Sequence, residues 1–299
     1  MTGSWNFEVK EYTHDPLAPV GIFDSGVGGL TVVRAVLDLL PRERVVYFGD
    51  TARVPYGNKS PETVRRYNAE ITGFLSRLGV KMIVVACNTS SASAWDTITE
   101  TFRGPAIGVV EPGAIAAVRA TRNRRVGVIG TRSTIASGAY ERALRRLDPA
   151  VRVWSRPCPL FVPLAEEGWA DDPVTRLVAE KYLSPLLAEG IDVIILGCTH
   201  YPLLYHTIQN VAGTEITLVN SAAETAKAVQ AALSELQLLS PGGDEPSDFC
   251  ASDDIEGFRQ HYRAIVGEME ARFHLLTDLE TAPMSLCERY YHLPSREGK

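Results

Sequence analysis

The sequence has no long run of lysine or arginine, and its 299 residues carry a formal net charge of -6 at pH 7. A surface that binds nucleic acid neutralises phosphates with clustered cations, so this charge balance argues against a nucleic-acid partner. The sequence also lacks an apolar run of about 20 residues, the length that crosses a bilayer. These absences favour a small-molecule ligand and argue against a membrane partner.

The first residues lack the features of a secretory signal. Segment 1–19 is polar and charged and has no apolar core, so we expect a cytoplasmic protein. Because the cytoplasm keeps thiols reduced, we expect the five cysteines to be free thiols and not a disulfide framework. None of them forms a CxxC pair, and the six histidines lack zinc-finger spacing, so we expect no metal site.

Strand-like and helix-like segments alternate along the chain. Short β-branched runs bounded by Gly, Pro or polar residues are followed by amphipathic stretches, which predicts an α/β protein with parallel strands. Hydrophobic residues make up 45% of the chain, enough for a large core in two domains or one. The predicted strands are 20–23, 45–48, 82–86, 107–109, 126–129, 151–154, 191–196 and 217–219, and the predicted helices are 30–39, 61–78, 92–101, 114–119, 138–146, 173–188, 222–239 and 255–266.

The two halves of the sequence repeat each other. VGIFDS at 20–25 matches VGVIGT at 126–131, and VVACNT at 84–89 matches ILGCTH at 195–200, with one cysteine at the same place in each. Two similar halves commonly pack about a pseudo-twofold axis, so we expect Cys87 and Cys198 to face each other across the cleft between two domains. We expect a first α/β domain at 17–112 completed by 223–268, a second at 113–222, and a C-terminal extension at 269–299.

Cys87 and Cys198 each follow an apolar run, where a strand ends and a helix or turn begins. Open α/β sheets bind ligands at this edge, and backbone N–H groups at a helix start lower a thiol's pKa from about 8.5 toward neutrality. A single cysteine after an apolar strand is more often a small buried hydrophobe. The repeat favours a catalytic pair, and we expect His200, close to Cys198, to stabilise a thiolate or return a proton.

Asp24 and Ser25 follow the first predicted strand and precede a glycine-rich loop at 26–29. The loop is similar to a dinucleotide-binding fingerprint, but Thr31 stands where the third glycine is needed, and a Walker lysine is absent. We therefore expect Asp24 to accept a hydrogen bond from a substrate ammonium or to polarise a thiol, and the glycines to allow close packing.

Other residues near strand ends are weaker candidates. Pro55, Tyr56 and Gly57 follow the second predicted strand, and this rim position favours ligand contact over an ordinary surface turn. Glu166 is a candidate acid near Cys198, although solvated helix carboxylates are far commoner. The remaining cysteines lack activating neighbours, and we expect them to be structural: Cys158, Cys250 and Cys287.

Four motifs in a fixed order resemble the bacterial glutamate racemases of the aspartate/glutamate racemase family. They are DSGVGGLT at 24–31, YFGDTARVPYG at 47–57, ACNT at 86–89 and LGCTHYPLL at 196–204. The resemblance extends over residues 19–266 and implies two pseudo-symmetric flavodoxin-like domains with glutamate buried between them. It further implies catalysis without a cofactor, the supply of D-glutamate for peptidoglycan, and compatibility with a homodimer.

The resemblance also assigns roles to individual residues. It makes Cys87 the base that deprotonates D-glutamate and Cys198 the base that deprotonates L-glutamate. Ser90 stands where many members have alanine, a small-for-small change that leaves the assignment intact. The residues that match substrate-binding positions are Asp24-Ser25, Tyr56-Gly57, Asn88-Thr89, Thr199-His200 and Thr131.

Other functions remain open on the sequence. An aspartate or hydantoin racemase of the same fold would share the cysteine pair, although Tyr56 and the Thr199-His200 motif favour glutamate. A pyridoxal enzyme is disfavoured because no lysine stands at a strand end facing the predicted cleft. A non-catalytic small-molecule-binding or gyrase-inhibiting protein would tolerate the loss of either thiol, so the paired cysteines speak against it.

Overall fold

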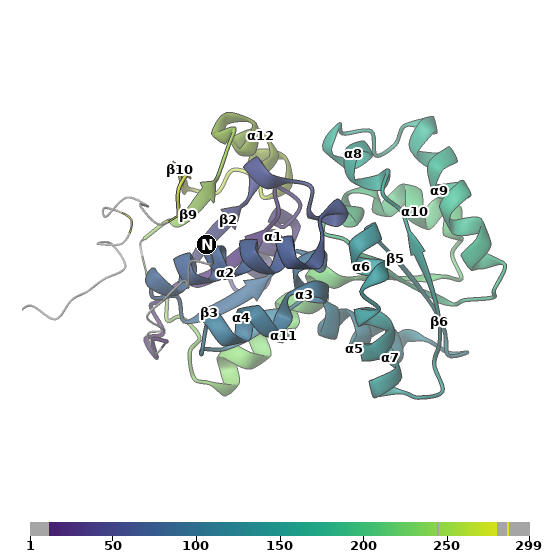
Figure 1. The fold of residues 1–299 in the computed structure, drawn as a ribbon, viewed down its shortest axis with the longest axis horizontal. Helices are drawn as coiled ribbons and strands as arrows, with labels where there is room; N and C mark the ends of the chain where they lie inside the picture. The colour runs from purple at the N-terminus through teal and green to yellow at the C-terminus, as the bar shows by residue number, and fades with distance from the viewer. Residues whose placement is uncertain (1–11, 244, 280–285, 287–299) are drawn as a thin grey trace, which may run out of the picture.

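The computed structural model describes residues 12–243, 245–279 and 286. They form two α/β halves that lie side by side along the longest axis of the molecule, each built on its own parallel sheet (Figure 1). The predicted α/β class with two parallel sheets is therefore confirmed.

The first half contains a sheet of six parallel strands in the order β10-β9-β2-β1-β3-β4. These strands are β1 (Val20–Asp24), β2 (Val45–Gly49), β3 (Met82–Val85), β4 (Ala106–Gly108), β9 (Ser247–Ala251) and β10 (Ala271–Leu275).

The second half contains a sheet of four parallel strands in the order β6-β5-β7-β8. This order repeats β2-β1-β3-β4 of the first sheet, so β5 corresponds to β1 and β7 corresponds to β3. The internal repeat predicted from the sequence is therefore present in the topology. The strands are β5 (Arg125–Gly130), β6 (Arg152–Pro157), β7 (Val193–Gly197) and β8 (Thr217–Asn220).

Two helices cross between the halves. Helix α5 (Val110–Ala120) follows a strand of the first sheet but packs against α7 and β7 of the second half, whereas α11 (Ser221–Glu235) follows β8 and packs against α1 and β4 (Figure 1). The other helices are α1 (Leu30–Leu39), α2 (Pro61–Arg77), α3 (Asn88–Ser93), α4 (Trp95–Thr101), α6 (Arg132–Ala136), α7 (Ala139–Leu147), α8 (Phe161–Glu166), α9 (Pro173–Leu187), α10 (Tyr205–Ala212) and α12 (Ile255–Ile265).

Each sheet separates two hydrophobic clusters because successive strand residues point to opposite faces. In β1, Ile22 packs into the cluster with α1 and α11, while Phe23 packs into the cluster with α2. In β7, Ile194 and Ile195 divide in the same way between the clusters of the second half. Burial on both faces explains why these strands are continuous apolar runs in the sequence.

The structure adds elements that the sequence analysis did not predict. Strands β9 and β10 extend the first sheet beyond β2, so residues 271–275, placed in a C-terminal extension, are its edge strand. The predicted helix at 92–101 is divided into α3 and α4 at Ala94. The expected domain boundaries, at 112/113 and 222/223, stay a prediction.

Candidate active site

The central strands of both sheets end in predicted site residues. Asp24 closes β1 and Cys87 follows β3, while Thr131 follows β5 and Cys198 follows β7. Since β1 and β3 correspond to β5 and β7, the two cysteines occupy equivalent places in the two halves. These four residues lie at the carboxyl ends of parallel strands, the usual ligand-binding edge of an α/β sheet.

Side chains from the two halves meet at this edge. Thr31 donates its hydroxyl hydrogen to the carbonyl of Thr199 at 3.0 Å, and the Thr199 hydroxyl donates to Asp24 Oδ1 at 3.4 Å. The hydroxyls of Thr89 and Thr131 lie 3.0 Å apart. Strand ends that are more than 40 residues apart in sequence therefore build one polar site between the halves.

Asp24 is fully buried at the centre of this site. Its Oδ2 accepts hydrogen bonds from the backbone N–H groups of Gly26 at 3.1 Å and Gly29 at 3.0 Å. Burial raises the pKa of Asp24, and the charge of His200 and the backbone hydrogen bonds only partly oppose that effect. The contact of Oδ1 with the Thr199 hydroxyl is long, at 3.4 Å, and a carboxylate oxygen has two lone pairs, so Oδ1 retains capacity for another donor.

Cys87 caps the N-terminus of α3, where its sulfur accepts a hydrogen bond from Ser90 N at 3.5 Å. The prediction that this position lowers the thiol's pKa is wrong for this structure. Burial, followed by the negative charge of Asp24, raises the pKa of Cys87 to about 12, and the hydrogen bonds from Ser90 and Ser25 do not compensate. Desolvation outweighs the short helix because a buried thiolate is poorly solvated. Cys87 therefore holds its proton at neutral pH.

Cys198 is also buried but has an imidazole partner. The sulfur lies 3.8 Å from Nδ1 of His200, and Nε2 of His200 lies 2.9 Å from Oε1 of Glu166. Burial opposes the charge on His200, but its hydrogen bonds to Cys198 and Glu166 outweigh burial and raise its pKa to about 10. The imidazole of His200 therefore connects the carboxylate of Glu166 with the sulfur of Cys198.

Glu166 lies at the end of α8 with its side chain 41% exposed, so it connects the buried imidazole with solvent. Desolvation raises the pKa of Glu166, but the hydrogen bond and charge of His200 outweigh desolvation, so the pKa is lowered overall. The sequence named Glu166 as a candidate acid near Cys198 without predicting this contact, since 34 residues separate it from His200.

The remaining predicted binding residues divide into buried and exposed positions. Tyr56 is buried in one cluster with Cys87, and its hydroxyl donates to the carboxylate of Asp50. Gly57 lies so close to Thr131 that a β-carbon would approach the threonine β-carbon to 2.7 Å. Pro55 is exposed at the start of this turn.

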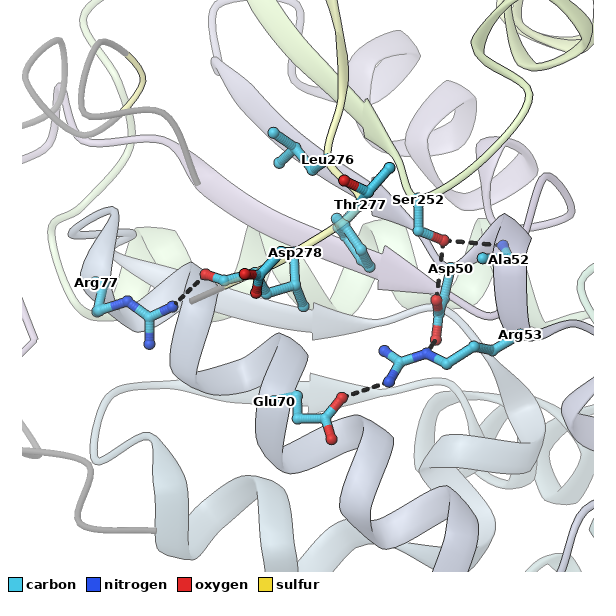
Figure 2. A pocket seen from close by; sticks show the side chains of 11 residues that line it. Asp50, Ala52, Arg53, Glu70, Arg77, Ser252, Leu276, Thr277 and Asp278 are labelled. Atoms are coloured by element: carbon cyan, nitrogen blue, oxygen red, sulfur yellow. Dashed lines mark hydrogen bonds and ion pairs between the residues drawn. The ribbon is translucent and has the colours of Figure 1, made fainter. Parts of the chain in front are cut away.

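The partners of Asp50 line a separate pocket of about 350 Å³ (Figure 2). Arg53 donates to Asp50 at 2.6 Å and to Glu70, and the Ser252 hydroxyl donates to Asp50 at 3.0 Å. The lining residues include Asp50, which follows β2, and Ser252, which follows β9, so the pocket lies at the ends of these two strands. These contacts fix the carboxylate that anchors Tyr56.

Sequence reasoning missed a second layer of buried polar residues. Asn88 donates from Nδ2 to the hydroxyl of Tyr140 at 2.7 Å, and that hydroxyl lies 3.2 Å from Ser221 Oγ. Ser90 donates to Asn68 Oδ1 at 3.0 Å. Tyr140 lies in an ordinary amphipathic helix, and no local pattern distinguishes it from a core aromatic.

The other cysteines that the structure describes are buried among apolar side chains, although Cys158 shares its cluster with Cys198. Cys158 and Cys250 are fully buried in hydrophobic clusters, and burial raises the pKa of both thiols. Cys287 lies outside the described residues.

Within residues 12–243, 245–279 and 286, no helix combines the length and apolarity that a membrane span requires. Among the same residues, no group of three or more His, Cys, Asp or Glu side chains is arranged to hold a metal ion.

The family model described as Asp/Glu/Hydantoin racemase matches residues 29–229, a range that contains both cysteines. The chain belongs to this family. A glutamate racemase of Geobacter metallireducens is 52% identical over 244 residues, which cover 81% of this chain and 90% of the relative. One of Syntrophus aciditrophicus is 54% identical over 225 residues, which cover 75% of this chain and 83% of the relative.

Solved structures of Asp/Glu/Hydantoin racemase family members share this arrangement. The Francisella tularensis glutamate racemase in complex with D-glutamate has a TM-score of 0.82 at 35% identity and covers 89% of this chain and 99% of its own. The Bacillus anthracis isoform RacE1 has a TM-score of 0.83 at 36% identity and covers 87% of this chain and 97% of its own. The two-domain α/β architecture is therefore that of the glutamate racemase structures.

Proposed function

We propose that this racemase interconverts L- and D-glutamate by moving the α-proton between Cys87 and Cys198, and that it supplies D-glutamate for peptidoglycan. The observation that carries the proposal is the equivalent placement of the two thiols after β3 and β7, at the edge where the two halves meet. The high identity to glutamate racemases favours glutamate over aspartate or hydantoin as the substrate.

Two bases solve the geometry of racemisation. The α-proton must leave one face of the carbon and a proton must return to the other, which a single fixed base cannot do without exchange. In the forward direction the Cys198 thiolate takes the proton from L-glutamate, and the resulting carbanion takes a proton from the Cys87 thiol. After D-glutamate leaves, Cys198 is a thiol and Cys87 is a thiolate, which is the state of the enzyme that starts the reverse reaction.

The protonation states at rest fit the forward direction. Because burial raises the pKa of Cys87 to about 12, this residue begins as the proton donor. His200, whose pKa is raised to about 10, is cationic at neutral pH, and its Nδ1 lies 3.8 Å from the sulfur of Cys198. We propose that the free enzyme is thereby prepared for L-glutamate. Glu166 assists by its contact with His200, and Asp24 assists by binding the substrate.

The polar groups around the thiols suggest how the substrate is held. The hydroxyls of Thr89, Thr131 and Thr134 lie within 3.0 to 3.2 Å of one another and provide donors for a carboxylate. Asp24 and Asn88 provide acceptors for the ammonium. We propose that the substrate-binding set is completed by Ser25, Pro55, Tyr56, Gly57, Thr199 and His200.

The test is circular-dichroism polarimetry of the purified protein with L-glutamate or L-aspartate, without any added cofactor. We expect the L-glutamate signal to decay to zero as the racemate forms, while the L-aspartate signal stays constant. Preferential loss of the L-aspartate signal would show that aspartate, and not glutamate, is the substrate. A constant signal with both amino acids would contradict racemisation.

We also propose that the protein is a cytoplasmic homodimer. Four thiols, Cys87, Cys158, Cys198 and Cys250, are unpaired, which suits a reducing compartment. The dimer rests on the resemblance to the family alone. Size-exclusion chromatography with light scattering tests it, and a mass equal to the 32.7 kDa of one chain would contradict it.

A further inference from the structure

Asn88 has a buried side-chain oxygen that lacks a hydrogen-bond partner among the described residues. Its Nδ2 donates to the Tyr140 hydroxyl at 2.7 Å, but Oδ1 accepts nothing. Asn88 as a whole is 3% exposed and follows Cys87 directly. Buried polar atoms in proteins are almost always paired, so an unpaired acceptor beside a catalytic thiol points to a donor that arrives with the ligand.

The direction of a hydrogen-bond chain decides which end of the Asn88 amide faces outward. The carbonyl of Leu196 can only accept, and the hydroxyl of Ser221 donates its one hydrogen to it at 3.2 Å. Tyr140 must therefore donate to Ser221, at 3.2 Å, and its oxygen is left to accept from Asn88. A flipped amide would place Oδ1 against a hydroxyl that has no hydrogen left to give.

Packing holds Tyr140 in place between the two thiol-bearing strand ends. Its ring is 2% exposed, and β-carbons at Gly197 and Gly113 would come within 3.2 and 3.4 Å of it. Gly197 directly precedes Cys198, so the tyrosine extends from one cysteine's strand to the turn of the other. Burial raises the pKa of Tyr140 to about 12, which keeps its hydroxyl protonated at neutral pH.

We propose that Tyr140 is a positioning residue that orients the Asn88 amide so that its Oδ1 receives the α-ammonium group of the substrate. The proposal rests on the proposed function, in which Asn88 binds an amino acid. Both carboxylates of glutamate are acceptors at neutral pH, and its ammonium is the only donor. An outward Oδ1 therefore recognises the ammonium and is indifferent to a ligand without one.

The experiment compares glutamate with glutarate, a dicarboxylate of the same length that has no amine. In the Tyr140→Phe variant we expect KM for L- and D-glutamate to rise about tenfold, the loss typical of a hydrogen bond to a charged group. The inhibition constant of glutarate against glutamate turnover should stay within about twofold of the wild-type value. An equal change for both ligands would overturn the proposal, because it would indicate a general structural defect.

Two further variants separate the role of Tyr140 from folding. Asn88→Ala should also raise KM for glutamate without changing the inhibition constant of glutarate. In the Asn88→Ala background, Tyr140→Phe should raise KM for glutamate by less than about twofold more. Tyr262→Phe is the matched control, since it removes another hydrogen-bonded hydroxyl from a buried tyrosine, one that donates to Met269 O at 3.1 Å. It should lower the melting temperature without changing KM for either enantiomer.

The outcomes for the proposed function and for Tyr140 are distinct. A wild-type protein that does not racemise glutamate would overturn the function and this inference with it. Wild-type turnover with fully additive effects of Tyr140→Phe and Asn88→Ala would overturn the inference alone. If Tyr140→Phe does not fold, Ser221→Ala tests the same chain from its other end, and an unselective effect there would overturn the proposal equally.

Discussion

Gly28 of the first half lies against His200 of the second. A β-carbon at Gly28 would stand 2.5 Å from the imidazole Nδ1 and 2.5 Å from the Thr199 hydroxyl oxygen. Nδ1 is also the atom that faces the Cys198 sulfur. The glycine-rich loop after β1 therefore allows the imidazole to approach Cys198, which is the close-packing role expected from the sequence and not the role of a phosphate cradle.

Substitution of Gly28 by alanine should displace this imidazole. We expect kcat/KM for L-glutamate to fall on the order of tenfold or more, with a loss of about 1–3 kcal/mol in the free energy of unfolding from overpacking. Racemisation assays and urea denaturation measure the two effects. Gly243→Ala is the control, because nothing lies within 4 Å of a β-carbon there. Normal activity of Gly28→Ala would contradict the geometry.

Each of the two site thiols should be indispensable. We expect Cys87→Ser and Cys198→Ser to lower kcat for racemisation by a factor on the order of 10²–10⁴ or more, because a serine hydroxyl is a far weaker acid. Circular dichroism in the far ultraviolet should show intact folds. Cys250→Ala, which changes a buried thiol on β9, should keep its activity, and a serine variant at either site with normal turnover would eliminate the two-thiol mechanism.

The charge on His200 should make stability depend on pH. Its pKa in the folded protein is about 10, above the ordinary value of 6.5. A raised pKa contributes stability that is complete below pH 6.5 and is lost as the pH rises through about 10. The free energy of unfolding should therefore fall by up to several kcal/mol across this window. In His200→Asn this fall should be reduced, and an unchanged pH profile would show that the imidazole is not charged.

Glu166 should act through the imidazole. Glu166→Gln keeps a hydrogen-bond acceptor near His200 Nε2 but removes the negative charge that raises the imidazole's pKa. We expect the pKa of His200, followed by NMR, to fall, and kcat for L-glutamate to drop on the order of tenfold. Glu167→Gln alters the exposed neighbouring carboxylate and should have no effect. A drop in kcat without any shift in the His200 resonance would argue for a different role.

Much of the fold could be predicted because buried parallel strands are continuous apolar runs. Strands β1, β2, β3, β5 and β7 stand out in this way, and the repeat placed Cys87 and Cys198 at equivalent positions in the topology. Strand β9 was missed because its five residues, Ser247–Ala251, include a serine and an aspartate and follow a segment rich in proline and glycine. Helix α6 has five residues and α8 has six, too short for a helical period to appear.

The site was predictable only where its residues adjoin the strand ends. Contacts between distant segments left no local pattern, as with Glu166 on His200 and Tyr140 on Asn88. The protonation of Cys87 was mispredicted for a related reason. The sequence revealed the helix start that stabilises a thiolate, but the burial that opposes it depends on the packing of Tyr56 and other residues of its cluster.

The most direct test of the two-thiol account is racemisation of L-glutamate in deuterium oxide, analysed at low conversion. In this account the proton that leaves the substrate goes to Cys198, and the one that arrives comes from the Cys87 thiol after that thiol has exchanged with solvent. We predict that the D-glutamate formed carries deuterium at Cα while the remaining L-glutamate still carries protium. D-glutamate without deuterium, or L-glutamate deuterated as fast as the product, would contradict proton transfer by two separate bases.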